Sequence, residues 1–342
     1  EQIAERQAAL RALPSWNPDY DFIWQWPLPV EEFARAQEAL TAHMVLPVGV
    51  VGPLRVNLGR YRVHAETGQL VEEDRDTEDV YVPLAHTEGG LSASMLRGIT
   101  AVFASGGVRT FVLHDRMTRD SCFVFRTTED AVTFSRWVAA NAPALRAWLR
   151  DPRNPLFEQQ VGGVARLSRH AQLWEVDTHV VGSACHILYR YTTGDAAGLN
   201  MITRNSHALN HEFILKRFPE ETGIHPVRLF LEANMGGDKK ASALYYIEGG
   251  HGKTVLAEAT ISGETLRRVL RTTAADLIAL EHAGIHGSIA SDMQSVAATP
   301  ASTIAAIFAA TGQDLGMVGT SSMAHEVLEP VEDGVHLSIR LS

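Results

Sequence analysis

In the stretch "EANMGGDKKAS" (232–242), a Gly-Gly pair is followed directly by three charged residues, Asp238, Lys239 and Lys240. The hydrophobic runs "VRLFL" (227–231) and "ALYYIE" (243–248) flank it and predict two buried strands, so the charges lie at the turn between them. A buried lysine needs a lowered pKa or an anionic partner. Solvated charges at a surface turn are more common, so the remaining sequence must decide whether this turn does chemistry.

Two pairs of histidines have the four-residue spacing of zinc-binding pairs: His207 with His211, and His282 with His286. Neither pair encloses the glutamate of a zinc protease, and neither has a third ligand nearby in the sequence. We therefore expect structural histidines and no metal site.

The glycine-rich stretch "GGHGKT" (249–254) has part of the pattern of a phosphate-binding loop. That pattern requires a glycine where Ile247 stands, and a strand that leads into a helix rather than the hairpin expected here. No G-x-G-x-x-G motif follows a predicted strand either. We expect neither a P-loop nor a Rossmann dinucleotide site.

The bulk composition excludes several classes of protein. The 342 residues carry a net charge of −10, which leaves no basic surface for nucleic acid or an anionic membrane. No apolar run approaches the roughly 20 residues that span a bilayer, and the first residues, "EQIAERQAAL", predict an amphipathic helix rather than a signal peptide. Cys122 and Cys185 are too few for a disulfide framework, so a cytoplasmic protein is expected.

The pattern of helices and strands that must position the charged turn changes twice along the chain. Before the first change, we expect a helix over 31–44, a strand region that ends near residue 85 with an acidic loop at 72–79, and a helix over 87–105 with Glu88 in its first turn. After the turn, we expect a hairpin over 241–261, a long helix over 262–284 capped by Ser262, a helix over 299–311 and a closing hairpin over 326–342.

The middle of the chain has the β-α-β-β-α-β order of a ferredoxin-like unit. The pattern predicts strands over 122–127, 164–175, 180–192 and 226–231, and helices that begin at Thr127 and near residue 198. The run Thr127, Thr128, Glu129 and Asp130 is typical of a helix N-terminus. We place this inserted small domain at residues 119–232, so the charged turn is the junction where the chain returns to a larger domain.

Four segments together resemble the signature motifs of the hydroxymethylglutaryl-CoA (HMG-CoA) reductase family. In chain order they are "LPVGVVGPL" (46–54), "VPLAHTEGGLSAS" (82–94), "TTGDAAGLNM" (192–201), and "GGDKK" with "GQD". The resemblance covers about residues 36–342, and the motifs are closer to the form shared by eukaryotes and archaea (class I) than to the bacterial form. It implies a mixed α/β (α+β) fold in which a large substrate domain, residues 1–118 and 233–342, carries an inserted ferredoxin-like NADP-binding domain, residues 119–232.

The resemblance implies that NADPH reduces an acyl-CoA thioester by two hydride transfers, from 3-hydroxy-3-methylglutaryl-CoA to mevalonate and CoA in isoprenoid biosynthesis. Lys239 matches the catalytic lysine, a cation brought into a closed site beside the carbonyl oxygen where negative charge develops. Glu88 matches the glutamate that protonates the forming alcohol. Asp314 matches the aspartate that couples to both and keeps the lysine charged. The family also implies a homodimer with shared active sites.

Position in the motifs assigns the remaining site residues. Asp238 would steady Lys239, while Lys240 and Arg119 would hold the substrate carboxylate, for which the arginine offers a bidentate fork. The other substrate-binding positions are Ser94 and Arg97, near the CoA, and Glu232 in the acyl pocket. The cofactor positions are Asp195 and Asn200, toward the nicotinamide, and Ser168 and Arg169, which favour NADPH over NADH through its 2′-phosphate.

The sequence departs from the family pattern. Glu232 replaces a serine of the acyl pocket, where it would neutralise nearby cations or repel a substrate carboxylate unless it points away; Ser302 and Val318 replace asparagines. The family pattern continues beyond the equivalent of Ser342 to a tail whose histidine protonates the departing CoA thiolate. We therefore expect either a piece of a longer protein or a diverged homologue. The alternatives for the latter are a reductase of another acyl thioester and a non-catalytic acyl-CoA- or dinucleotide-binding protein.

Overall fold

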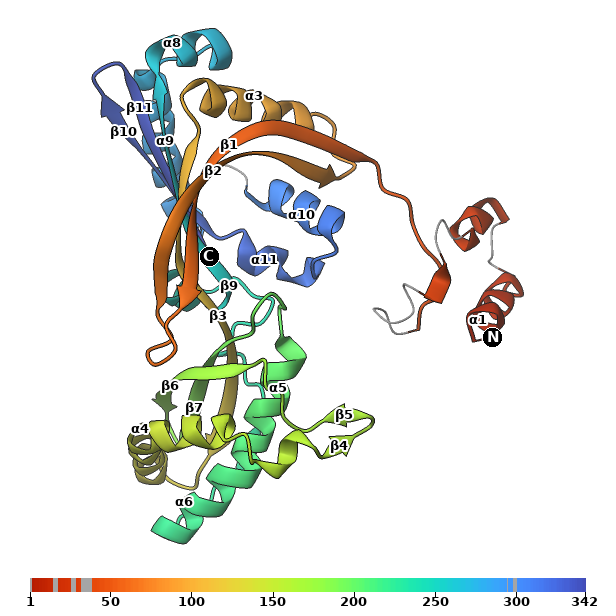
Figure 1. Ribbon diagram of the computed structural model, residues 1–342, viewed down its shortest axis with the longest axis vertical. Coiled ribbons are helices and arrows are strands. Elements are labelled where there is room, and N and C mark those ends of the chain that lie inside the picture. The colour runs from red at the N-terminus through yellow and green to blue at the C-terminus, as the bar shows by residue number, and fades with distance from the viewer. Residues whose placement is uncertain (1, 15–17, 26–28, 32–38, 294, 298–299) are drawn as a thin grey trace.

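The computed structural model describes residues 2–14, 18–25, 29–31, 39–293, 295–297 and 300–342. Within these residues the chain forms a nine-stranded sheet, a separate two-stranded ribbon, and helices that cover parts of the large sheet (Figure 1). The mixed helix-and-strand fold predicted from the sequence is confirmed. In the described part of the chain, no helix is long and apolar enough to cross a membrane.

β3 (Val108–Val124) joins the two halves of the large sheet. Its N-terminal part pairs antiparallel with β9 (His251–Ser262) and, over a short stretch, parallel with β1 (Val48–Val63). The sheet continues from β9 to the terminal hairpin and from β1 to its hairpin partner, which have these bounds: β11 Gly334–Leu341, β10 Ala324–Val331 and β2 Leu70–Ala85. The predicted closing hairpin is therefore confirmed.

The C-terminal part of β3 begins the predicted β-α-β-β-α-β order. The elements that follow are α4 (Thr128–Arg150), β6 (Gln172–Val181), β7 (Ala184–Thr192), the helical run α5 (Leu199–Ala208), η3 (Leu209–Ile214) and α6 (Leu215–Thr222), and β8 (Arg228–Phe230). The strand order is β8-β3-β7-β6 with every neighbour antiparallel, which is a ferredoxin-like arrangement. Because β3 is continuous through residue 119, the exact domain limits stay a prediction.

The largest hydrophobic core of the described residues lies inside this ferredoxin-like region. Phe134 of α4 is fully buried, and its ring centroid lies 4.7 Å from that of Phe123 and 4.8 Å from that of Phe218. The predicted cap of α4 is present, because the Thr127 hydroxyl accepts the Asp130 N–H at 3.1 Å. The short η2 helix (Pro155–Phe157) and the ribbon of β4 (Gln160–Val161) and β5 (Val164–Ala165) connect α4 to β6.

The acidic stretch 72–79 was predicted as a loop, and that prediction is wrong. It is the middle of β2, paired along its length with β1. The acidic side chains lie beside arginines of β1, in the ion pairs Arg55–Asp79 at 2.9 Å, Arg60–Asp76 at 2.9 Å and Arg62–Glu73 at 2.5 Å. Opposite charges that face each other across two strands favour pairing, and this exposed hairpin uses them in place of apolar residues.

The segments that flank the charged turn also differ from the prediction. The run 227–231 forms the short edge strand β8, with Phe230 49% exposed rather than buried. The run 243–248 is not a strand but the helix α7 (Ala243–Glu248), which ends at Gly249 with φ of 70°. A short apolar run does not distinguish a strand from a helical turn by periodicity alone, and Tyr245 is the one residue of α7 that is fully buried.

The long helix predicted over 262–284 is two helical segments. Ser262 caps the first, α8 (Gly263–Thr265), as predicted, and η4 (Leu266–Leu270) continues it. Arg271 then takes a left-handed φ of 57° and ends the run. Thr273 begins α9 (Ala274–Ala290) by accepting the Asp276 N–H at 3.2 Å, a second cap signal inside the predicted helix.

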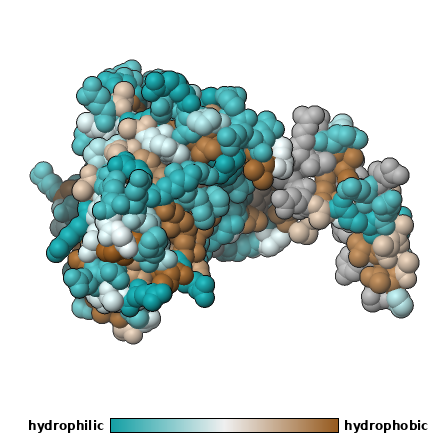
Figure 2. Space-filling model, turned by 90° about the horizontal axis from the view of Figure 1, so that it is seen from below, coloured by the Kyte–Doolittle hydropathy of each residue, from teal (hydrophilic) through white to brown (hydrophobic). Residues whose placement is uncertain are grey.

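The N-terminal segment stands apart from the body of the molecule (Figures 1 and 2). Its helix α1 (Gln2–Arg11) forms as predicted, but it is not amphipathic, because its apolar residues do not gather on one face and none of its described residues is buried. A 3-10 turn, η1 (Pro18–Trp24), follows it. Of the helix predicted over 31–44, residues 32–38 lie outside the described residues, and residues 39–44 are not helical, so that part of the prediction is wrong.

Candidate functional site

Asp120 of β3 fixes the beginning of the charged turn. Its carboxylate accepts the N–H groups of Ala233 at 3.1 Å and Met235 at 3.2 Å, and it lies 3.1 Å from Nδ1 of His186 on β7. A fully buried carboxylate needs such partners, and Asp120 has no exposed surface. Sequence reasoning missed this residue. The feature of the sequence that could have identified Asp120 is a charged residue shortly before the apolar run of a predicted buried strand.

The middle of the turn packs against α7 and β9. His251 donates its Nε2–H to the Gly236 carbonyl at 2.8 Å, and burial lowers the pKa of His251, so the imidazole is neutral at pH 7. The Tyr245 hydroxyl donates to the Met235 carbonyl. The Tyr245 ring also occupies the space beside Gly237, where any Cβ would clash with it. The turn is therefore held by hydrogen bonds and by one aromatic ring.

Lys239 and Asp314, which are far apart in the sequence, form an ion pair. Lys239 Nζ lies 2.7 Å from Asp314 Oδ2, while Asp314 Oδ1 accepts the Gly316 N–H at 2.9 Å and so caps η5 (Leu315–Met317). The hydrogen bond to Asp314 raises the pKa of Lys239, and the same bond, with that from Gly316, lowers the pKa of Asp314. Both groups are therefore charged at neutral pH.

The backbone around this ion pair is specialised. Lys239 has a φ of 58°, in the left-handed region that non-glycine residues rarely adopt and that is concentrated at functional sites. Gly316 lies against the lysine side chain, and a Cβ there would be 2.8 Å from Lys239 Cδ. The side chains of Lys239 and Asp314 are 46% and 40% exposed. One chain therefore forms an open ion pair, not the closed site that was expected.

Glu88, the third expected catalytic residue, is exposed and lies before its helix. The helix α3 (Leu91–Ala104) begins after Gly90, which takes a left-handed φ of 89°, so the prediction that Glu88 belongs to the first turn is wrong. Among the described residues, Glu88 forms no ion pair with Lys239, which pairs with Asp314 instead. Ser94 and Arg97 lie on α3 and are exposed as well.

Arg119 is nearly buried, with 9% of its side chain exposed, and it is already paired. Its Nη1 lies 2.9 Å from Glu232 Oε2, and its Nη2 lies 3.9 Å from Asp238 Oδ2. Lys240 Nζ donates to the Asp238 carbonyl at 3.0 Å. The structure thus places four of the expected substrate-binding residues together, and it shows that Glu232 points toward the arginine rather than away from it.

Ser168 and Arg169, two of the expected cofactor residues, lie on a loop that the buried side chain of Asn205 connects to α5. Asn205 of α5 accepts the Ser168 N–H at 2.8 Å and donates to the carbonyls of Ser168 and Ala171, each at 3.0 Å. Arg169 is exposed, pairs with Glu158 at 2.8 Å and lies over a phenylalanine ring. Asn205 was missed in the sequence, where a polar residue inside a predicted helix was its signal.

The other two expected cofactor residues lie at the start of α5. Asp195 is on the loop before the helix and Asn200 in its first turn, and both are exposed. Gly198 begins the helix with φ of 74°, and no side chain of the described residues caps it, so its first N–H groups can meet an external acceptor. With the exposed guanidinium of Arg169, this donor set fits an anionic dinucleotide such as NADPH.

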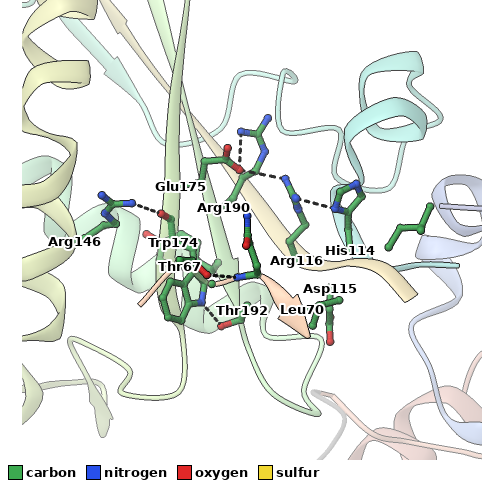
Figure 3. Close-up of a pocket in the computed structure, with 14 residues that line it drawn as sticks. Thr67, Leu70, His114, Asp115, Arg116, Arg146, Trp174, Glu175, Arg190 and Thr192 are labelled. Carbon is green, nitrogen blue, oxygen red and sulfur yellow. Dashed lines mark hydrogen bonds and ion pairs between the residues drawn. The ribbon is translucent and has the colours of Figure 1, made fainter. Parts of the chain in front are cut away.

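A cavity of about 550 Å³ lies elsewhere, between the β1–β2 turn and the sheet (Figure 3). Its arginines are engaged inside the chain as follows: Arg116 with Glu175 at 3.2 Å, Arg190 with Asp177 and Glu248, and Arg146 with the Trp174 carbonyl at 2.7 Å. Burial, followed by the charge of Arg116, lowers the pKa of the adjacent His114. None of the expected site residues is among its described lining residues, so the cavity is distinct from the charged turn.

Comparison with known proteins gives one family over nearly the whole chain. The family model described as hydroxymethylglutaryl-coenzyme A reductase matches residues 2–342. Proteins named 3-hydroxy-3-methylglutaryl-coenzyme A reductase are 33% identical over 313 residues in Aeropyrum pernix, 32% over 316 in Pyrococcus abyssi and 31% over 312 in Fusarium fujikuroi. These matches cover 91%, 92% and 90% of this chain, but 66%, 68% and 28% of the relatives. The chain thus spans about two thirds of the archaeal proteins.

Solved structures of HMG-CoA reductases have a fold similar to that of this chain. A class II 3-hydroxy-3-methylglutaryl-CoA reductase from Streptococcus pneumoniae, bound to NADPH in open conformations, aligns with a TM-score of 0.60 at 16% identity. The alignment covers 99% of this chain and 83% of that one. A likeness at this identity concerns the fold, so the closer resemblance to the class I form stays a prediction.

Proposed function

The chain belongs to the hydroxymethylglutaryl-coenzyme A reductase family, and from this premise we propose that it reduces an acyl-CoA thioester to an alcohol with NADPH. The observation that carries the proposal is the 2.7 Å contact between Lys239 and Asp314. It joins the "GGDKK" and "GQD" motifs, the two segments in which a charged catalytic pair is expected. The substrate in the names of the relatives, 3-hydroxy-3-methylglutaryl-CoA, is the first to test.

The proposed role of Lys239 is to stabilise the negative charge that develops on the thioester oxygen. Asp314 keeps the ammonium protonated and fixes its direction, because the hydrogen bond between them raises the pKa of Lys239. A preorganised donor of this kind typically contributes about 10²–10³ in rate. When bound, the nicotinamide supplies the hydride. Glu88 is proposed to deliver the proton to the forming alcohol.

We propose that residues 119–232 bind the cofactor and that the remaining parts, 1–118 and 233–342, bind the substrate. Asn205 supports this assignment, because its three hydrogen bonds tie the Ser168–Arg169 loop to α5 and so hold the two cofactor segments in one arrangement. Arg169 would exchange its exposed partner Glu158 for a 2′-phosphate, a more strongly charged acceptor.

A homodimer with shared active sites is proposed as the working assembly. Glu88, Ser94 and Arg97 are exposed in a single chain, as residues that meet a second subunit would be. Large apolar side chains on the same part of the molecule are exposed too, namely Val48, Val50 and Tyr81 at 57%, 65% and 64%. The cytoplasmic location expected from the sequence stays a prediction.

One observation favours a second candidate substrate class. Glu232 already forms an ion pair with Arg119, the residue expected to hold the carboxylate of 3-hydroxy-3-methylglutaryl-CoA. A thioester without that distal carboxylate would leave this ion pair intact. The reaction type would be unchanged.

The proposal is tested by following NADPH oxidation with 3-hydroxy-3-methylglutaryl-CoA and identifying the product by mass spectrometry. We expect consumption of two NADPH per mevalonate formed, as two successive hydride transfers require. Binding of NADPH and of acyl-CoA without any turnover, with this thioester or with one that lacks the distal carboxylate, would instead support the non-catalytic alternative.

A further inference from the structure

Two of the three cations at the acyl end of the proposed site already pair with carboxylates of the same chain. Arg119 contacts Glu232 at 2.9 Å and Asp238 at 3.9 Å, and Lys239 contacts Asp314 at 2.7 Å. Lys240 donates to a backbone carbonyl of the same turn and is the remaining cation among these residues. Arg119 and Lys239 therefore lie against three carboxylates, and the nearby Asp120 accepts hydrogen bonds from the turn's own N–H groups and lies beside His186.

Both carboxylate oxygens of Glu232 have partners within the chain. Oε2 pairs with Arg119, and Oε1 accepts the N–H of Asn234 at 2.8 Å. The side chain is 30% exposed, so solvent reaches one side of the carboxylate while the buried arginine holds the other. A Cβ at Gly236 would lie 2.8 Å from Oε2, so the glycine leaves the space in which this carboxylate lies. The ion pair, the backbone hydrogen bond and the space left by Gly236 together fix the position of this carboxylate beside Arg119.

We propose that Glu232 acts as an internal ligand of Arg119 and makes the site prefer acyl-CoA thioesters whose acyl group carries no distal carboxylate. This inference rests on the proposed function, which places the acyl group at the charged turn. A substrate carboxylate must either displace Glu232 from Arg119 or lie beside it. Two like charges about 4 Å apart at an effective dielectric of about 20 disfavour binding roughly a hundredfold to a thousandfold.

The preference is measured with two thioesters that differ only at this end: 3-hydroxy-3-methylglutaryl-CoA and 3-hydroxy-3-methylbutyryl-CoA. Their dissociation constants, from calorimetry, and their kcat/KM values are compared for the unaltered chain and for Glu232→Gln and Glu232→Ser. We expect the unaltered chain to favour the neutral thioester. Each variant should shift the ratio about a hundredfold toward the carboxylate-bearing one. Glu232→Gln keeps an acceptor for Arg119, so this variant retains the buried hydrogen bond if Glu232→Ser unfolds.

Glu72→Gln is the matched control. Glu72 also pairs with an arginine at 2.9 Å and is 37% exposed, but it lies on the β1–β2 hairpin, so its loss should leave the ratio unchanged. If Glu232→Gln binds and reduces both thioesters with the unaltered ratio, the inference is wrong while the proposed function stands. If neither thioester binds or reacts with any of these proteins, the proposed function itself is wrong, and the inference falls with it.

Discussion

The ferredoxin-like region and the charged turn are stabilised in different ways. The first encloses fully buried aromatic and aliphatic side chains between its sheet and α4, α5 and α6, including Phe134, Leu145 and Tyr191. The second is a turn in which Lys239 and Asp314 are nearly half exposed. Its backbone donates hydrogen bonds to Asp120 and accepts them from Tyr245 and His251. A single chain thus encloses the core of the ferredoxin-like region completely but leaves the proposed catalytic charges open to solvent.

We expect the ferredoxin-like region to determine the stability of the fold and the charged turn to determine activity. Burial of apolar area contributes about 25 cal/mol per Å², so the fold depends most on the ferredoxin-like core. The charged turn contributes little of that area, and exposed ion pairs add about 0–1 kcal/mol each. We therefore expect substitutions in the core to change the free energy of unfolding, and substitutions in the turn to change activity with the fold retained.

The largest effect on stability is expected from Leu145→Ala. Leu145 is fully buried, and removal of its side chain leaves a cavity that costs about 2–5 kcal/mol of the free energy of unfolding. The matched control is Leu315→Ala beside Asp314, where the leucine is 57% exposed and the cost should be within about 0.5 kcal/mol. Urea unfolding of both variants measures the contrast. Equal losses would show that the two regions are stabilised alike.

Arg169→Ala should give the next largest effect, on cofactor choice. We expect NADPH binding to weaken by about 1.5–3 kcal/mol, because only NADPH presents a 2′-phosphate for a charge-assisted contact, while NADH binding stays nearly constant. Arg153→Ala is the control, since Arg153 is an 88% exposed arginine of the same region paired with Asp151. Fluorescence titration with both nucleotides gives the four affinities. Parallel losses for NADPH and NADH would make Arg169 structural.

A smaller effect is expected from Asp314→Asn on the pH dependence of turnover. Asp314 raises the pKa of Lys239, so without its carboxylate the ammonium loses its proton at a lower pH. The alkaline limb of the kcat profile should therefore move to lower pH. The effect of Asp314 on stability appears at the acid end of the pH range instead. Because the pKa of Asp314 is lowered in the folded chain, its carboxylate adds stability that is present at neutral pH and lost on acidification. That term is small for a pair this exposed. An alkaline limb that does not move would separate Asp314 from the titration of Lys239.

Local signals in the sequence predicted much of the fold. The α4 cap at Thr127 and the order of strands and helices after β3 depend on residues close together in the chain, and both are present. The acidic strand 72–79 was misassigned because its stabilising partners are arginines of β1, which a local pattern does not include. The run 243–248 was misassigned because a short, mostly apolar run fits either a strand or a short helix.

The site was predicted in part, and for a different reason. The family resemblance named Lys239 and Asp314, and the structure brings them together, but no residue pattern reveals a contact of that kind. Asp120 was missed because its hydrogen bonds to the turn join residues 113 and 115 positions apart. The orientation of Glu232 was left open by the sequence, since a carboxylate beside a glycine-rich turn points either way until Arg119 is placed against it.

The most direct test of this account is turnover by Lys239→Ala. Lys253→Ala is the matched control, because Lys253 also pairs with an aspartate, Asp115 at 2.8 Å, and is 56% exposed, but it lies away from the turn on β9. We expect Lys239→Ala to lose about 10²–10³ or more of kcat with an unchanged unfolding midpoint, and Lys253→Ala to retain its activity. If Lys239→Ala keeps turnover within a few-fold of the unaltered chain, the charge of Lys239 does not stabilise the reaction, and the proposed mechanism is wrong.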